Sequence, residues 1–265
     1  ELRNQHPSGN YMTIQTLTGG GILTTVQPGF VEQTNAEYHG GPGTSKSDLA
    51  LFAQSPLHWW HAKRNPDREM DGEQTASKLL GSAIHSAVLE PDLFPSEYVS
   101  VPDDAPRRPT DRQVNAKKPS ADTMDAIAWW RDFELANTGK ELLKPEQYAT
   151  ALAVRDAVRR HPIARTLFTG GRAEQSVHAV DPETGEHIKC RFDYLSGMAV
   201  DLKSCDDASP AGFGRATFNF SYYLQPPWYF DVMKAAFGEA PPFWVFVAVE
   251  TSAPYAIGIY YVTAE

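Results

Sequence analysis

Two aspartates and a lysine fall within one short segment, residues 189–204, whose residue pattern predicts a β-hairpin. If the hairpin turns near Gly197, Asp193 and Asp201 lie opposite each other, and Lys203 shares a face with Asp201. Two carboxylates at short range repel each other strongly unless a cation lies between them. The segment therefore predicts a site for a divalent metal such as Mg²⁺, which Mn²⁺ could replace, beside an ammonium group.

An Asp-x-Lys pattern taken alone is also compatible with a solvated surface hairpin that binds no ion. Two further residues favour the metal site. Glu174 lies at the start of the preceding predicted strand and could face the same cluster. His85 lies in a largely apolar helix, in which Gly81 would allow close approach to a neighbouring strand. A hydrogen-bonded structural histidine is the alternative interpretation of His85.

A later segment adds an amide and a phenol. Gln225 and Tyr229 are four residues apart and share one face if their segment is helical. Pro226 and Pro227 lie between them, which is compatible with a helix only in its first turn.

Helices and strands must bring these side chains together from distant parts of the chain. Helices are expected over about 45–55, 55–61, 76–89, 121–137 and 145–160, before strands at 173–180 and in the 189–204 hairpin. A helical crossover then leads to a buried strand at 243–250 and its hairpin partner at 256–262. This order predicts the α/β (α+β) class, with a mixed central β-sheet flanked by helices.

Composition limits the other possibilities. The chain has 265 residues, 42% of them hydrophobic, and a formal net charge of -9, which disfavours a protein that coats nucleic acid through many basic contacts. It has neither an apolar run long enough to span a membrane nor a secretory pattern at its start, so we expect no membrane partner and a cytoplasmic location. Residues 1–27 are expected to form a flexible extension, and residues 28–265 a single domain.

The spaced residues, in chain order, are Gly81-x-x-x-His85, Glu174, Asp193, Asp201-x-Lys203 and Gln225-x-x-x-Tyr229. This order resembles the PD-(D/E)xK nucleases of the RecB-like branch, and most closely the exonuclease VIII (RecE) type. The resemblance covers about residues 28–265 and implies a restriction-endonuclease-like core.

The resemblance also implies a role for each residue. His85, Asp193 and Asp201 would bind the metal together with the Leu202 carbonyl. Lys203 would assist the attacking water. Glu174 would act in the second shell of the metal or hold a second ion. Gln225 and Tyr229 would position the scissile strand.

Nucleases of this type digest one strand of linear double-stranded DNA from its 5′ end. They leave a 3′ overhang for a single-strand annealing protein, and they assemble as toroidal homotetramers. These properties are expectations from the resemblance. There are two alternatives. One is a non-catalytic nucleic-acid-binding module with the same fold, and the other is a nuclease that prefers single-stranded DNA or RNA.

Overall fold

A mixed six-stranded sheet forms the centre of the computed structural model, which describes residues 14–17, 23–65, 67 and 75–263. Its order is β10-β9-β8-β7-β6-β3, with β3 (Gly29–Val31), β6 (Arg172–Val180), β7 (His187–Leu195), β8 (Ala199–Cys205), β9 (Phe243–Glu250) and β10 (Ile257–Thr263). Strands β6, β7 and β8 form an antiparallel meander, β8 pairs with β9 in parallel, and β10 returns antiparallel. The predicted meander, crossover and terminal hairpin are confirmed, and with them the fold class.

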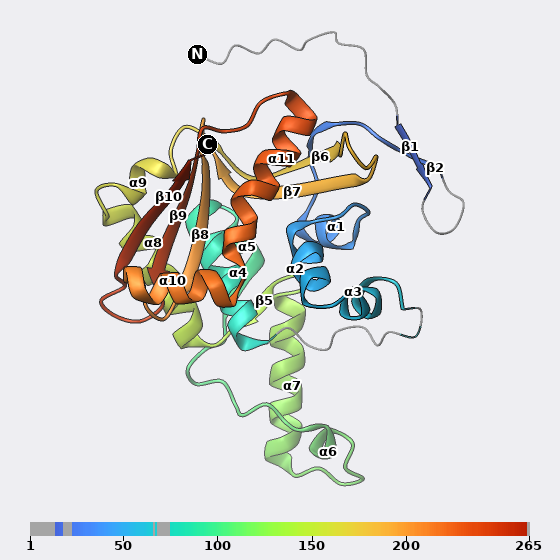
Figure 1. The fold of residues 1–265 in the computed structure, drawn as a ribbon. Coiled ribbons are helices and arrows are strands. Elements are labelled where there is room, and N and C mark those ends of the chain that lie inside the picture. The colour runs from blue at the N-terminus through green and yellow to red at the C-terminus, as the bar shows by residue number, and fades with distance from the viewer. Residues whose placement is uncertain (1–13, 18–22, 66, 68–74, 264–265) are drawn as a thin grey trace.

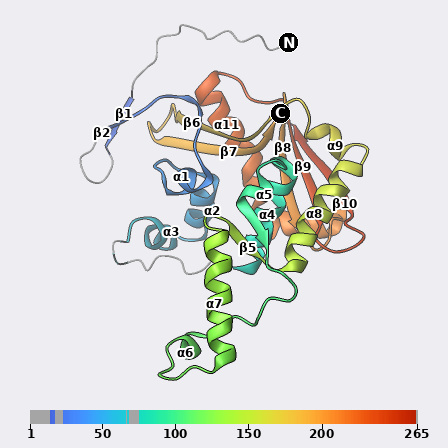
Figure 2. The same ribbon diagram turned by 180° about the vertical axis from the view of Figure 1, so that it is seen from behind.

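Helices cover both faces of this sheet (Figures 1 and 2). On one face, α4 (Ala76–Leu89) and α8 (Pro145–Arg160) enclose the α4-side core, which includes Ile84, Val154, Leu202 and Val247. On the other, α10 (Pro210–Asn219) and α11 (Gln225–Phe237) enclose the α11-side core, which includes Phe192, Phe213, Val232 and Trp244. Alternate residues of β9 enter the two cores, which explains why this strand is apolar throughout.

The remaining elements complete the described chain. They are β1 (Ile14–Leu17), β2 (Leu23–Val26), α1 (Asn35–Gly40), α2 (Lys46–Gln54), α3 (Pro56–Lys63), α5 (Phe94–Glu97), β4 (Tyr98–Ser100), α6 (Asp111–Val114), α7 (Ala121–Ala136), β5 (Glu141–Leu143), α9 (Ala164–Leu167) and η1 (Tyr222–Leu224). Helices α6 and α7 project from the rest of the protein (Figure 1). No helix among the described residues combines the length and apolar character that crossing a bilayer requires.

The segment expected to be a flexible extension contains a short antiparallel pair, β1 and β2. Residues 1–13 and 18–22 of that segment lie outside the described residues. The domain boundary at residue 28 stays a prediction.

Strands β7 and β8 form a fork. They pair only at Tyr194↔Val200 and Leu195↔Ala199, after which β7 continues beside β6 and β8 beside β9. This register places Asp193 opposite Asp201, as predicted from the hairpin. Figure 1 shows the β6–β7 hairpin leaving β8, β9 and β10 at an angle. The peptide groups of β8 beyond the fork therefore need partners other than β7.

The first strands of the meander are irregular where they approach this fork. Glu174 has a left-handed backbone with φ 51°, and neither Glu174 nor Asp193 takes part in the β6–β7 ladder, which pairs Ala173 with Tyr194 and Gln175 with Phe192. Phe192 packs in the α11-side core and Tyr194 in the α4-side core, although a regular strand would keep them on one face. The exchange of faces occurs at the two acidic residues.

Candidate active site

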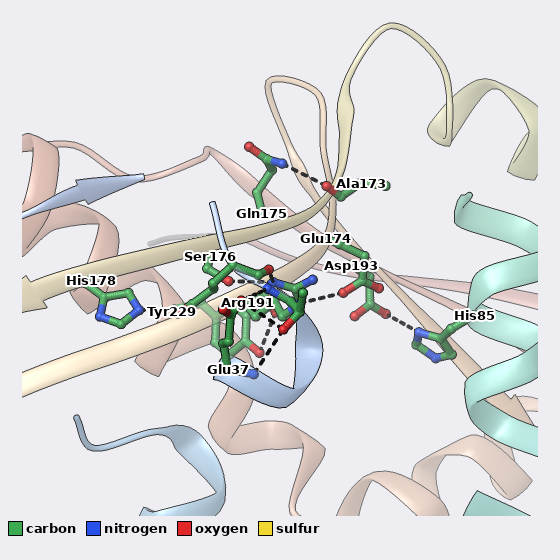
Figure 3. Close-up of polar contacts among 12 residues, drawn as sticks. Glu37, His85, Ala173, Glu174, Gln175, Ser176, His178, Arg191, Asp193 and Tyr229 are labelled. Atoms are coloured by element: carbon green, nitrogen blue, oxygen red, sulfur yellow. Dashed lines mark hydrogen bonds and ion pairs between the residues drawn. The ribbon is translucent and has the colours of Figure 1, made fainter. Parts of the chain in front are cut away.

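The fork leaves the Leu202 amide without a β7 partner, and a carboxylate takes that place. Leu202 N–H donates to Asp193 Oδ2 at 2.8 Å. From α4, the His85 ring approaches the same oxygen, with Nδ1 at 3.5 Å. Burial lowers the pKa of the His85 ring, and a hydrogen bond with the Leu202 backbone opposes this shift only in part. Asp193, Leu202 and His85 thus meet at the open end of the fork. Figure 3 shows the contact between Asp193 and His85.

Glu174 joins this group across the meander. One donor atom from each of His85, Glu174 and Asp193 lies within 4.8 Å of the others, and all three side chains are partly accessible. We call these residues the three-donor cluster. One imidazole and two carboxylates form a donor set that suits Mn²⁺ and, through the oxygens, Mg²⁺.

The electrostatics of the three-donor cluster match such an ion. Burial and the nearby Asp193 carboxylate raise the pKa of Glu174. Burial likewise raises the pKa of Asp193, and burial followed by the charge of Lys203 lowers the pKa of His85. The carboxylates therefore crowd each other while the imidazole stays neutral, and a cation between them would relieve the repulsion.

Arg191 holds Glu174 from the side away from His85 (Figure 3). Its Nε donates to Glu174 Oε2 at 2.6 Å, and its Nη1 donates to Ser176 Oγ at 2.7 Å and to the Gln33 carbonyl at 3.0 Å. The sequence reasoning assigned no role to Arg191. Its position two residues before Asp193 was the available signal, because alternate residues of a strand lie near one another.

Asp201 and Lys203 form a second group beside the three-donor cluster. They share one face of β8, as predicted, and the Lys203 ammonium pairs with Asp201 Oδ2. Gln225 donates its amide N–H to Asp201 Oδ1. Both carboxylate oxygens of Asp201 are therefore engaged by side chains, and metal binding by Asp201 and by the Leu202 carbonyl stays a prediction.

Burial and the neighbouring charges together set the protonation of this pair. Asp201 is 1% exposed, and burial raises its pKa to about 6 although Lys203 opposes the shift. For Lys203, burial lowers the pKa, but the charges of Asp201 and Asp193 outweigh burial, so its pKa is raised. Lys203 is therefore an ammonium at neutral pH.

The two prolines do not disrupt the helix that carries Gln225 and Tyr229. Helix α11 begins at Gln225, so Pro226 and Pro227 lie in its first turn, where a missing N–H costs nothing. Both polar side chains are buried, and Tyr229 O–H donates to the Arg191 carbonyl at 2.9 Å. Gln225 thus contacts β8 and Tyr229 contacts β7, the two strands that carry the aspartates of the site. Positioning of a scissile strand by these two residues stays a prediction.

The predicted close approach of α4 at Gly81 has a modest steric basis. A Cβ at this position would lie 3.9 Å from Ser204 Oγ, which is an ordinary van der Waals distance. Alanine would therefore fit, and the approach of His85 to β7 does not depend on glycine.

Lys46 is a second cation that sequence reasoning missed. Its Nζ lies 5.8 Å from the centre of the Tyr222 ring, and Lys203 Nζ lies 4.9 Å from the same ring. Burial, followed by the charge of Lys203, lowers the pKa of Lys46. The sequence around Lys46 indicated only a helix start, which is confirmed by the Ser45–Asp48 capping box. Nothing local to it indicates a contact with a residue so distant in the chain.

Comparisons with known proteins agree with this geometry. Residues 45–265 match the model of a family described as a PDDEXK-like domain of unknown function (DUF3799). The crystal structure of a "Putative exonuclease" from Eubacterium rectale is similar, with a TM-score of 0.56 and 15% identity over 88% of this chain and 79% of that chain. At that identity the likeness concerns the fold alone. No curated protein matches the sequence significantly. Neither match separates the exonuclease VIII type from other PD-(D/E)xK nucleases.

Proposed function

Because the chain belongs to the PDDEXK-like family DUF3799, we propose that it is a divalent-metal-dependent nuclease that digests linear double-stranded DNA from its ends. The observation that carries the proposal is the three-donor cluster, which lies beside the Asp201–Lys203 ion pair. Neutral imidazole, crowded carboxylates and a fixed ammonium are the groups that phosphodiester hydrolysis needs at one place.

In this proposal His85, Glu174 and Asp193 hold Mg²⁺ or Mn²⁺, with Asp201 and the Leu202 carbonyl as further ligands. The bound ion would supply Lewis acidity to the scissile phosphate and to the attacking water. Arg191 fixes the orientation of Glu174, and the Leu202 amide fixes that of Asp193.

The other side chains of the site act through charge and position. Lys203 carries a raised pKa, so its ammonium would stabilise negative charge that builds on the phosphate, and it would not serve as the general base. Asp201 and Gln225 hold that ammonium in place. Tyr229 anchors β7 at Arg191, which keeps the carboxylates of the fork in register.

The finer assignments rest on the resemblance to the exonuclease VIII type. They are 5′→3′ digestion, a 3′ overhang passed to a single-strand annealing protein, and a toroidal homotetramer. The alternatives are a binding module without catalysis, and a nuclease for single-stranded DNA or RNA.

Digestion of end-labelled linear duplex DNA tests the proposal directly. With Mg²⁺ or Mn²⁺ the protein should shorten the labelled strand, and EDTA should stop the reaction. Asp193→Asn and Lys203→Met should each lower the rate by about 100-fold or more, because the first weakens the hold on the metal and the second removes the charge that stabilises the reacting phosphate. Asp132→Asn, an exposed carboxylate on α7, is the matched control and should keep full activity.

The same assay separates the alternatives. Labels at either end report polarity, and blunt duplex, single-stranded DNA and RNA rank the substrates. Light scattering reports the oligomeric state. Binding of DNA without any metal-dependent cleavage would replace the proposal by the non-catalytic module.

A further inference from the structure

Three large aromatic side chains are exposed together where α10 ends and η1 begins. Phe218 is 76% exposed, Phe220 62% and Tyr223 52%, and we call these three residues the aromatic platform. Phe218 and Tyr223 stack with ring centres 6.5 Å apart, and Phe220 stacks on Tyr222 at 5.6 Å. Ordered aromatic faces presented to water in one patch are typical of a binding surface.

The backbone of this turn is constrained. Ser221, which separates Phe220 from Tyr222, has a left-handed conformation with φ 53°. A non-glycine residue in that region costs about 1 kcal/mol or more and persists where the surrounding structure requires it. Here the sharp turn directs the chain from α10 into η1 and leaves the three rings on the outside.

The aromatic platform adjoins the candidate active site through Tyr222. The ring of Tyr222 lies 4.9 Å from Lys203 Nζ, and it stacks on Phe220. Lys46 closes the other side, because its Nζ donates to the Phe220 carbonyl at 3.2 Å and lies over the Tyr222 ring. Lys46, Lys203 and the Tyr222–Phe220 stack therefore lie between the candidate active site and the exposed surface, where Phe218 and Tyr223 form a second stacked pair.

We propose that the aromatic platform stacks unpaired bases of the nucleic-acid strand whose phosphate is held at the active site. Aromatic faces stack on every base, which suits an enzyme that must accept any sequence. Lys46 supplies positive charge for a neighbouring phosphate on a protein whose net charge is -9. The proposal deepens the proposed function, and the role given to the platform beside the candidate active site rests on that function.

Base stacking on the platform determines which form of nucleic-acid end the protein can bind. Bases can reach the rings only if they are unpaired, so the protein engages a frayed or single-stranded end and not an intact terminal base pair. Ends with a terminal mismatch should then be better substrates than matched G·C ends. Removing the platform should lessen that preference.

Binding of a short single-stranded oligonucleotide that carries 2-aminopurine tests the platform without any cleavage, in EDTA. Contact with the rings should quench the probe. The double variant Phe218→Ala/Tyr223→Ala should bind about 5- to 50-fold more weakly, because each lost base–ring stack has a substantial effect. Tyr261→Ala, an exposed aromatic on β10, is the matched control and should bind as the native protein does.

Further variants distinguish stacking from a general loss of contact area. Phe218→Trp should retain binding, whereas Phe218→Leu should lose it, since leucine keeps apolar area but has no flat face. Lys46→Met should weaken binding and reduce the dependence on salt concentration by about one phosphate contact. Circular dichroism should be unchanged in the aromatic variants, because the substituted rings are exposed.

Hydrolysis of bis(p-nitrophenyl) phosphate with Mn²⁺ separates this proposal from the proposed function. The platform variants should hydrolyse this small diester at the native rate. A native protein that cleaves nothing, yet binds through the rings, would refute the nuclease and keep the platform. Native binding by the double variant, or loss of self-association instead of DNA binding, would overturn the platform.

Discussion

The Arg191–Glu174 pair offers a quantitative test of how the three-donor cluster is built. The Arg191 side chain is 12% exposed and donates to Glu174, Ser176 and the Gln33 carbonyl. Three variants form a double-mutant cycle: Arg191→Met, Glu174→Gln and the combination of both. Arg191→Met leaves a largely buried carboxylate, 22% exposed, facing Asp193 with no partner cation, which is the arrangement that such pairs avoid.

The expected magnitudes follow from that asymmetry. Arg191→Met should lower the free energy of unfolding by about 3–5 kcal/mol, the cost of breaking a buried pair. Glu174→Gln should cost less, because it also removes repulsion with Asp193. The double variant should therefore be more stable than the sum of the single effects predicts, by about 1–3 kcal/mol. Mn²⁺ should restore more stability to Arg191→Met than it adds to the native protein.

Urea denaturation in EDTA, followed by the same series with Mn²⁺, measures all of these quantities. Arg131→Met is the control, because Arg131 pairs with Asp132 on the exposed face of α7 and should cost at most about 1 kcal/mol. Additive costs for Arg191 and Glu174 would show that the two groups do not depend on each other. Equal Mn²⁺ effects in all four proteins would remove Glu174 from the ion site.

Other predictions concern single groups. His85→Ala should weaken Mn²⁺ binding by about 10-fold or more in isothermal titration calorimetry, and an unchanged affinity would exclude His85 as a ligand. Burial, aided by His178, lowers the pKa of His187 to about 4, below the 6.5 of an unfolded histidine, so stability should fall by at most about 3 kcal/mol between pH 6.5 and 4. His187→Asn should flatten that pH profile in urea titrations. Lys189→Met should destabilise by about 2–3 kcal/mol, because the Lys189 ammonium donates to the Tyr38 and Gly41 carbonyls, and a change under 0.5 kcal/mol would contradict this.

Local patterns in the sequence predicted the parts of the fold that local physics determines. Helix α4 spans residues 76–89 as expected, and α7 and α8 agree with their predicted ranges within one residue. The period of two along β8 placed Lys203 beside Asp201, since alternate residues of a strand share a face whatever the rest of the fold is. The hairpin register also followed from the turn at Gly197.

Local sequence patterns did not predict the contacts between segments that are distant in the chain. The fork between β7 and β8 depends on β8 pairing with β9, more than 40 residues later in the chain. The contact between Lys46 and Tyr222 joins two helical segments whose own sequences carry no sign of it. The resemblance to a nuclease family suggested which residues meet, but not that the oxygens of Asp201 are engaged by Lys203 and Gln225.

Glu174 shows why the three-donor cluster differs from an ordinary sheet surface. An extended residue at position 174 would direct its side chain according to the alternation of β6, but the left-handed backbone breaks that alternation. Such a conformation costs about 1–3 kcal/mol, and the hydrogen bonds of Arg191 offset part of the cost by holding the carboxylate. Arg191 therefore does more than neutralise a charge, because it stabilises the strained strand that brings the second carboxylate to the fork.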